Sequence, residues 1–322
     1  MGVRADLVEE PLPPGDGGPG AEQHRNWLWQ AVRESTQAKV GLGVLLFFIV
    51  IAILAPWIAP YDARTSVGPP FGPPSLQHPL GLDDGGIDML SLLMHGGRSS
   101  IIVGFAATFV AMVIGGGIGI IAGYFGGWPD LGLMRVTDYF LVIPDLPFAI
   151  VVAAVWGPGL VHLVFVIALL LWTTTARIIR AQVKSVRERT YVKRARSLGA
   201  SDLRIIVRHV LPQIGPLLIA NTVLTAAIAI FDETALAFLG LGDPSAITWG
   251  NIIEFGFLRT AISAGAWWAI VPAGLCVAFV IMGCYWLGQS IEDALNPRLK
   301  VAYLSPRQFR VQALVTRRQD QP

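Results

Sequence analysis

Long apolar stretches recur along this 322-residue chain, and they constrain its fold more than any other feature. A helix needs about 20 mostly apolar residues to cross a bilayer, and the sequence offers six such segments. They lie at residues 40–58, 100–124, 139–156, 160–175, 214–231 and 267–287. The composition, 53% hydrophobic and only 14% charged, excludes a soluble enzyme, a disordered scaffold and a coiled coil. We therefore expect an all-α integral membrane protein with six transmembrane helices.

Positively charged residues are distributed unevenly between the segments that join these spans. Residues 176–212 contain ten Lys or Arg against two acids, whereas the loops on the opposite side contain only Arg64, Arg98 and Arg259. Six spans place both termini on one side, which then carries 21 of the 24 basic residues. Because cytoplasmic loops carry an excess of Lys and Arg, we expect the termini and the 176–212 loop in the cytoplasm.

The remaining segments are predicted to be tails and loops. Residues 1–22 are rich in Pro, Gly and acidic residues and are predicted to be a disordered cytoplasmic tail. Residues 23–39 are expected to be a cytoplasmic segment next to the membrane. The six-span domain is expected over residues 40–300, with its cytoplasmic loop at 176–212, and residues 301–322 form a basic cytoplasmic tail.

The cytoplasmic loop contains a segment, residues 187–213, with the pattern of two short helices joined by a turn. Val192, Ala195 and Leu198 recur at helical spacing. Gly199 follows them and supplies the left-handed conformation that commonly ends a helix. The first helix is therefore expected to end at this glycine.

The second helix of this segment is expected to begin after Ala200. Ser201 can cap it, and Asp202 lies favourably at its positive end. An apolar face opposes the basic residues Arg204 and Arg208. This face consists of Leu203, Ile206, Val207 and Val210. Pro212 then begins the next span, where its missing N–H matters least.

Two interpretations of this loop remain open. A basic loop can lie on anionic lipid head groups, which the excess of charge alone would explain. The apolar face and the tight turn instead favour a rigid protrusion that docks into a groove on a partner protein. Nucleic-acid binding is not expected, because no aromatic stacking platform accompanies the basic residues.

At this loop the chain resembles a known family. Gly199, followed by Leu211-Pro212 at the end of an amphipathic stretch, is similar to the EAA loop of ABC-importer permeases. Lys193-Arg194-Ala195 stands where that family has Glu-Ala-Ala, and Gln213 stands where Asn is usual. The resemblance implies that the loop couples the chain to a cytoplasmic ATPase. The residues to which it assigns this coupling are Ala195, Gly199, Ala200, Ser201, Asp202, Leu203, Ile206 and Pro212.

Further motifs resemble one branch of these permeases, the importers of dipeptides, oligopeptides and nickel. Residues 78–88, HPLGLDDGGID, are similar to the HPLGTDxxGRD signature of that branch. Glu233 and residues 238–242 resemble its E-x-x-L-S-F-L-G-L-G stretch, and Asn296-Pro297-Arg298 sits where Asp-Pro-Arg usually closes the last span. The resemblance extends over about residues 25–300.

This resemblance implies the C-type permease subunit of such an importer, with the type I ABC importer permease fold. It further implies a homologous second permease subunit, a pair of subunits that bind ATP and Mg, and a solute-binding protein outside. No cofactor is expected in this chain itself, and membrane lipids surround it. The expected location is the cytoplasmic (inner) membrane of a bacterium or archaeon. Di- or oligopeptides are the expected cargo, with nickel as the alternative.

Four polar or ionisable residues near membrane depth are candidates for the translocation path. Asn221 and Thr225 share one face of the fifth predicted span, where they either line the path or form hydrogen bonds between packed helices. Glu233 follows at the outer end of that span. Asp145 lies between two prolines, where it either lines the path or caps a broken helix near the cytoplasmic surface.

Two shorter patterns predict contacts of the helices. Gly115 and Gly119 have the small-residue spacing that lets two membrane helices approach closely. Arg135 and Asp138 are one helical turn apart and are expected to form an ion pair.

Several motifs of enzymes are absent from the sequence. No G-x-x-x-x-G-K-[ST] run occurs, so another chain must bind ATP if ATP drives transport. No catalytic constellation and no Cys/His metal cluster is visible, so we do not expect an enzyme or a metal site. Two other classes stay open. One is an ion-coupled secondary transporter, which Asp145 alone would support, and the other is a membrane scaffold or receptor subunit without a transport path.

Overall fold

The computed structural model describes residue 33 and residues 35–295. The regular secondary structure of this part of the chain is helical apart from one isolated bridge between Leu82 and Asp88. The long helices are α2 (Thr36–Ile58), α3 (Met89–Phe125), α6 (Leu160–Arg187), α9 (Leu211–Phe238) and α11 (Val271–Leu295). The shorter elements are α4 (Gly127–Val142), α5 (Asp145–Trp156), α7 (Thr190–Ser197), α8 (Asp202–Ile205), a π-helical turn (Ile206–Val210), α10 (Trp249–Leu258) and a 3-10 turn (Trp267–Ala269). The predicted tails, residues 1–22 and 301–322, and the Asn296-Pro297-Arg298 motif lie outside the described residues.

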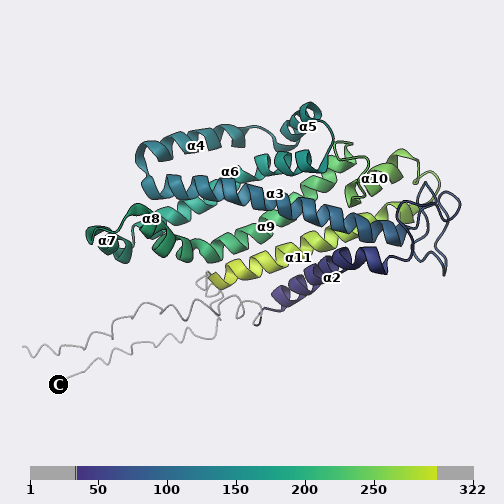
Figure 1. Cartoon of the computed structure of the whole chain (residues 1–322), viewed down its shortest axis with the longest axis horizontal. Helices are drawn as coiled ribbons and strands as arrows, with labels where there is room; N and C mark the ends of the chain where they lie inside the picture. Colours follow the sequence, from purple (N-terminus) through teal and green to yellow (C-terminus); the bar gives the residue numbers. More distant parts are fainter. Residues whose placement is uncertain (1–32, 34, 296–322) are drawn as a thin grey trace, which may run out of the picture.

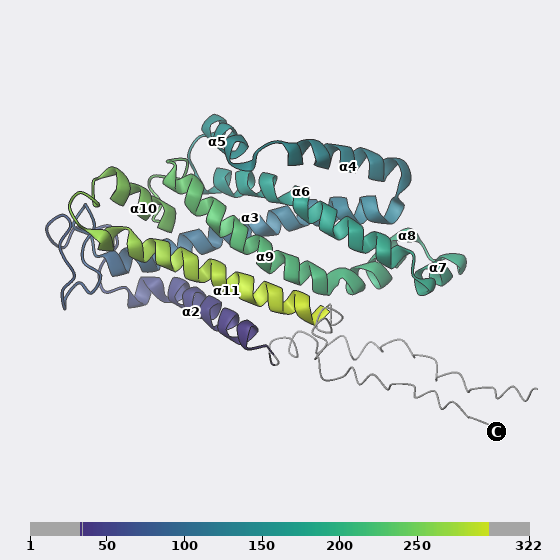
Figure 2. The same cartoon turned by 180° about the vertical axis from the view of Figure 1, so that it is seen from behind.

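The long helices lie side by side along the long axis, so the molecule has two distinct ends (Figure 1). The connection between α2 and α3, residues 59–88, lies at one end together with α10, and we call this the loop end. Residues 188–210, which include α7 and α8, lie at the other, which we call the α7–α8 end. Figure 2 shows the same separation from behind. Helix α9 packs on both α3 and α11, and so joins the two sides of the bundle.

Five helices are long and apolar enough to cross a membrane, and the pair α4–α5 would make a sixth if it forms one broken span. The helices extend beyond the predicted apolar segments. Helix α3 begins at Met89 rather than near residue 100, and α6 continues to Arg187 rather than 175. The extra turns are amphipathic or polar, so a search for apolar residues alone leaves them out.

The predicted straight span over residues 139–156 is instead two helices. α4 ends at Val142, and α5 turns away from it by 93°. Ile143 and Pro144 have extended backbone between them, with ψ of 129° and 127°. A residue that precedes a proline is kept out of the α-helical region, so Pro144 stops α4 and starts the turn.

Glycines hold α3 and α6 in close contact. A Cβ atom added at Gly115 would lie 2.3 Å from the Trp172 carbonyl oxygen, and one at Gly119 would lie 2.7 Å from that of Ala176. Gly123 continues the row one turn later against α6. No side chain fits between these backbones, so the close contact predicted from Gly115 and Gly119 is confirmed.

A second close contact joins α2 to α11. A Cβ atom at Gly41 would lie 2.7 Å from the Gly283 carbonyl oxygen. Backbone approach of this kind maximises van der Waals contact between helices where lipid provides no hydrophobic driving force. Among the long helices, such backbone contacts therefore join α3 to α6 and α2 to α11.

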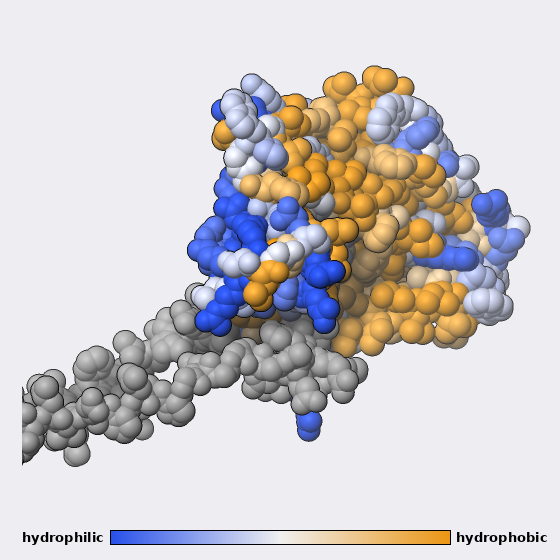
Figure 3. All heavy atoms as spheres, turned by 60° about the vertical axis from the view of Figure 1, so that its left-hand side comes forward, coloured by the Kyte–Doolittle hydropathy of each residue, from blue (hydrophilic) through white to orange (hydrophobic). Residues whose placement is uncertain are grey.

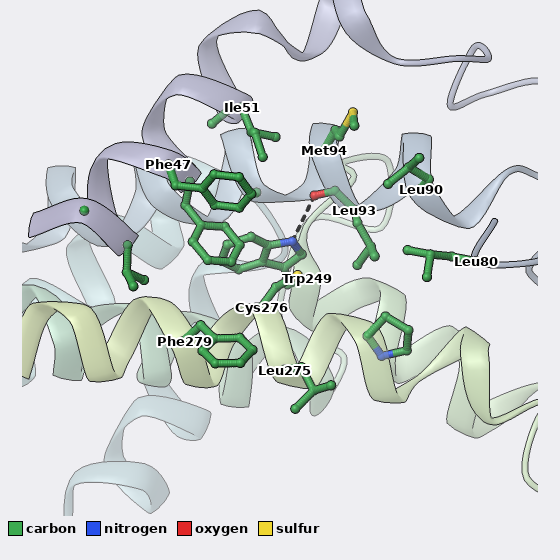
Figure 4. A pocket seen from close by; sticks show the side chains of 16 residues that line it. Phe47, Ile51, Leu80, Leu90, Leu93, Met94, Trp249, Leu275, Cys276 and Phe279 are labelled. Carbon is green, nitrogen blue, oxygen red and sulfur yellow. Dashed lines mark hydrogen bonds between the residues drawn. The ribbon is translucent and has the colours of Figure 1, made fainter. Parts of the chain in front are cut away.

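An apolar crevice of about 580 Å³ opens between α2, α3 and α11. Trp249, the first residue of α10, forms its base, and its indole N–H donates a 3.0 Å hydrogen bond to the Leu93 carbonyl oxygen (Figure 4). The side chains around it are apolar, with Phe47 and Phe279 on opposite helices (Figure 4). This lining suits hydrocarbon and offers no group that would hold a polar solute.

Candidate functional site

The turn between α7 and α8 has the geometry that the sequence predicted. Gly199 has φ +80°, the left-handed conformation. Its N–H donates to the Arg196 carbonyl oxygen at 3.0 Å, and the N–H of Ala200 donates to that of Ala195 at 3.1 Å. This pair of bonds is the Schellman motif that ends a helix at glycine. The predicted helix–turn–helix is therefore present.

The second helix of this segment does not stop before the next span. Residues 202–238 form one continuous helix of 37 residues, about 55 Å long. Pro212 lies in its interior, in the first turn of α9, and cannot donate to the Arg208 carbonyl oxygen. The π-helical turn Ile206–Val210 accommodates this missing hydrogen bond without ending the helix. α8 is therefore rigidly connected to α9.

An apolar cluster anchors the α7–α8 segment to the rest of the bundle. Its buried members come from α3, α6, the segment itself and α9. They are Tyr124, Ile179, Val183, Val186, Val192, Ile205, Val210 and Ile214. Ala195, Ala200 and Ile206 pack against its edge. The segment is thus a fixed protrusion and not a loose loop.

Tyr124 at the end of α3 is the polar centre of this anchor. Its hydroxyl donates a 2.6 Å hydrogen bond to the Asp202 carboxylate, and its carbonyl oxygen accepts one of 2.9 Å from Arg187. The guanidinium of Arg196 lies 5.4 Å from the centre of its ring. The nearby Tyr124 hydroxyl oxygen raises the pKa of Arg196. Sequence reasoning missed Tyr124, although an aromatic residue with a hydroxyl is common at the end of a span.

The predicted apolar face of the second helix is divided in the structure. Val210 points into the apolar cluster, but Leu203 is 73% exposed and Val207 is also exposed. Ile205, which the prediction left out, is buried in their place because the π-helical turn changes the helical register. Ser201 occupies the cap position but its side chain forms no cap hydrogen bond.

Two leucines project from the tip of the protrusion. Leu198 is 88% exposed on one side of Gly199, and Leu203 is exposed on the other. Figure 3, in which the α7–α8 end is turned forward, shows apolar and hydrophilic surface side by side there. Exposed leucines on a rigid, basic protrusion are typical of a protein-docking surface.

Lys193, one of the departures from the EAA pattern, has a defined partner. Its ammonium group lies 2.9 Å from the Glu188 carboxylate, which also pairs with Arg187 at 3.2 Å. These two cations, Lys193 first, lower the pKa of Glu188. The basic residue at this position thus ties the start of α7 to the end of α6.

Asn221 and Thr225 face the interior of the chain. They are 8% and 7% exposed. The Asn221 amide nitrogen lies 3.4 Å from the hydroxyl of Thr175 on α6 and 3.5 Å from that of Thr225. Of the two interpretations of these residues, this geometry favours hydrogen bonding between packed helices.

Glu233 is fully buried near the loop end of α9. Its Oε2 accepts a 3.3 Å hydrogen bond from Thr234, and Ser100 and Thr248 lie beside it. Its Oε1 has no hydrogen-bond partner among the described residues. The carboxyl group therefore joins α3, α9 and the start of α10, and it does not face an open path.

Asp145 is the one path candidate that is exposed. It is the first residue of α5, at the break that Pro144 makes. The whole of α4 separates it from the α7–α8 end (Figure 1), so it does not lie at the end of the molecule that the sequence analysis expects in the cytoplasm. It lies close enough to Asp232 on α9 for the two carboxylates to interact electrostatically.

Comparison with known proteins identifies the family of this helical bundle. Residues 115–301, more than half of the chain, match the family described as the binding-protein-dependent transport system inner membrane component. The chain belongs to this family. Residues 27–74 also match the N-terminal transmembrane domain of oligopeptide transport permease C. The resemblance found in the sequence is confirmed, and we refer to the chain below as the permease.

Named relatives are similar to the permease over most of its length. A putative peptide transport system permease protein of Brucella suis is 36% identical over 82% of this chain and 88% of its own. The dipeptide transport system permease protein of Bacillus subtilis is 33% identical over 84% and 85%. A glutathione transport system permease protein of Escherichia coli is 32% identical over 85% and 90%.

One solved structure has a similar fold. It is an inward-facing conformation of the MetNI methionine ABC transporter, at TM-score 0.52 and 16% sequence identity. The match covers 64% of the permease and 97% of that chain. It confirms the expected all-α permease fold.

The first and last side chains of the signature at residues 78–88 of the permease contact each other. His78 Nδ1 lies 2.9 Å from Asp88 Oδ1. The other oxygen of Asp88 accepts hydrogen bonds from the backbone N–H and hydroxyl of Ser91, at 2.9 and 2.8 Å. Asp88 thus caps α3 and fixes the loop in front of it.

Ion pairs hold α4 against α6. The nearly buried carboxylate of Asp130 pairs with Arg180 and, at 2.7 Å, with Lys184. Asp138 pairs with Arg177 of α6 at 2.6 Å. The predicted pair of Asp138 with Arg135 is therefore not formed, because a partner on the neighbouring helix takes its place.

Proposed function

We propose that the permease is one transmembrane subunit of an ATP-driven ABC importer for di- or oligopeptides. A homologous second permease would complete the translocation path. A pair of ATP-binding subunits would hold ATP and Mg, and an external solute-binding protein would deliver the cargo. The names of the relatives support peptides as the substrate class.

The observation that carries this proposal is the construction of the α7–α8 end. A rigid protrusion with two exposed leucines at its tip, Leu198 and Leu203, is continuous with the 37-residue helix that reaches Phe238. Movement of a bound ATPase subunit would therefore act directly on α9. Since α9 packs on α3, α6 and α11, its displacement would shift the helices on both sides of the bundle.

Co-purification of the tagged permease from its own membrane in mild detergent tests this assembly. We expect a second permease and a subunit with a P-loop to be recovered with it. Leu198→Ser combined with Leu203→Ser should release the ATP-binding subunit. The matched control is Leu76→Ser, because Leu76 is fully exposed but lies at the loop end.

Two results would contradict the proposal. Recovery of the wild-type permease alone after crosslinking would favour an ion-coupled secondary transporter, in which Asp145 would be the first residue to mutate. Full retention of the ATP-binding subunit by the double leucine variant would show that this subunit docks on another surface of the permease.

We further propose that the permease lies in the cytoplasmic membrane with both termini and the α7–α8 end inside. A cysteine introduced at Ser201 should react with an impermeant maleimide only after the cells are opened. A cysteine at Leu76 should react in intact cells. The reverse pattern would contradict this orientation.

A further inference from the structure

Two arginines at the loop end of the permease line one hollow. Only three basic residues lie in the loops on this side of the predicted spans: Arg64, Arg98 and Arg259. Arg259 pairs with the Asp84 carboxylate. Neither Arg64 nor Arg98 forms an ion pair among the described residues, and both line a hollow of about 710 Å³. Both arginines are exposed, so both guanidinium groups can reach a ligand in the hollow.

The hollow is built from four separate parts of the chain. One face of α3 forms its floor, and the first turn of α6 forms a wall. The loop after α2 contributes Arg64, and the segment after α9 contributes Asp243. Apolar side chains such as Ile102 and Val164 lie between these charged groups. The hollow is thus an amphipathic site, unlike the apolar crevice around Trp249.

Its positive side has more than the two guanidinium groups. Helix α6 begins here at Leu160, with Gly159 before it, no side-chain cap and no acidic residue in the first turn. The free N–H groups and the helix dipole at such a terminus favour an anion. His95 also lines the hollow, and its Nδ1 donates a 3.0 Å hydrogen bond to the Ser91 carbonyl oxygen, so the Nε2 of the neutral ring can only accept a hydrogen bond.

The hollow also contains one carboxylate. Asp243 Oδ1 accepts hydrogen bonds of 2.6 and 2.9 Å from the hydroxyl and backbone N–H of Ser245. These bonds lower the pKa of Asp243, so its side chain is ionised at neutral pH. Its Oδ2 has no hydrogen bond among the described residues. The site therefore presents separate positive and negative groups with apolar surface between them.

We propose that this hollow binds the zwitterionic backbone of a short peptide as it enters the translocation path. Arg64 and Arg98 hold the terminal carboxylate, Asp243 holds the terminal ammonium, and the apolar side chains between them contact the side chains of the peptide. This inference rests on the proposed function and deepens it, because it specifies cargo with both termini free. Arg and a carboxylate form bidentate hydrogen bonds that suit such recognition.

The test uses the complete importer with its own solute-binding protein, reconstituted in vesicles. The cargo is an equimolar mixture of di- to pentapeptides, supplied as free acids, as C-terminal amides or as N-acetylated acids. Import is measured by mass spectrometry at a saturating concentration of the solute-binding protein. Arg64→Gln with Arg98→Gln should lower import of free acids at least tenfold and remove the preference for acids over amides. Asp243→Asn, which keeps the oxygen that Ser245 bonds, should remove the preference for free over acetylated amino termini.

Other outcomes separate the possible errors. If the wild-type importer takes up none of the peptides, the proposed function fails. If it imports free acids and the double arginine variant does so equally well, the function stands and this inference is wrong. If the double variant instead weakens docking of the solute-binding protein, and lowers import of acids and amides by the same factor, the arginines bind that protein. A cysteine at Arg98 that no impermeant maleimide reaches in the assembled importer would mean that the partner permease fills the hollow.

Discussion

The hydroxyl of Tyr124, near the end of α3, donates a 2.6 Å hydrogen bond to the carboxylate of Asp202, the first residue of α8. These residues are 78 positions apart in the sequence. α6 and α9 are joined to the α7–α8 segment by the chain itself, whereas α3 reaches it through packing, this hydrogen bond and the contact of the Tyr124 ring with Arg196. The bond therefore anchors the α7–α8 segment to a third helix, α3.

We expect Tyr124→Phe to loosen the α7–α8 segment without unfolding the bundle. The phenyl ring keeps its packing and its contact with Arg196, while the loss of the hydrogen bond costs about 1 kcal/mol of local stability. Hydrogen exchange at the amides of residues 190–205 should become several-fold faster. Tyr191→Phe is the control, because the Tyr191 hydroxyl has no hydrogen bond among the described residues. Equal exchange in the two variants would contradict the anchoring role of Tyr124.

We expect Gly199→Val to separate ATP hydrolysis from uptake in the assembled importer. No heavy atom lies within 4 Å of the position that a Cβ atom would take, so the effect is one of conformation and not of space. A left-handed residue other than glycine costs about 1–2 kcal/mol, and a β-branched one more. Gly199→Asn, which tolerates this conformation, should retain most of the uptake. Uptake per ATP hydrolysed is the measurement, and a normal ratio in the valine variant would refute the prediction.

We expect Gly119→Ala to destabilise the permease by about 1–3 kcal/mol. The new methyl group would lie 2.7 Å from the Ala176 carbonyl oxygen, and α6 would have to move away. Gly117→Ala is a matched control in the same helix, since nothing lies within 4 Å of that position. Alanine there should leave stability unchanged or raise it by up to about 1 kcal/mol. Thermal unfolding in detergent measures both variants, and the same melting temperature for the two would contradict the close contact.

We expect Asp88→Ala to free residues 78–88 and the start of α3. The change removes the helix cap and the acceptor for His78 and Ser91, with a loss of about 2 kcal/mol. Limited proteolysis should cut the loop before α3 at lower protease concentration. Asp62→Ala is the control, because the Asp62 carboxylate accepts one hydrogen bond, from the Arg64 backbone N–H, in an exposed turn. If both variants are cut alike, the pairing of His78 with Asp88 does not hold the loop.

The sequence predicted those features that depend on short stretches of chain. Apolar length gives a spanning helix, and the left-handed Gly199 and the Gly115–Gly119 spacing each rely on residues within one or two turns. The break at Pro144 also has a local cause, the exclusion of the preceding residue from helical backbone. The apolar composition of residues 139–156 concealed it.

The features that the sequence did not predict depend on partners far along the chain. Asp138 pairs with Arg177 and not with Arg135, because α4 lies against α6. Ser201 has the residue type of a cap, but Asp202 beside it makes the bond to Tyr124. Asn221 could be assigned to packing only once Thr175 was found opposite it. A single sequence without its fold contains no signal for any of these pairings.

The two glycine contacts, Gly119 with Ala176 and Gly41 with Gly283, also determine which parts of the permease can move. Backbones that touch directly have no side chains between them to change rotamer, so neither α3–α6 nor α2–α11 can slide internally without separating. We therefore expect each pair to move as one body. α9 meets the two pairs through side chains packed on glycines, Ile230 on Gly104 and Leu224 on Gly288, and we expect the relative motion of a transport cycle there. Two spin labels within one pair would keep a constant separation during the transport cycle. The distance between a label on α9 and a label on either pair would change.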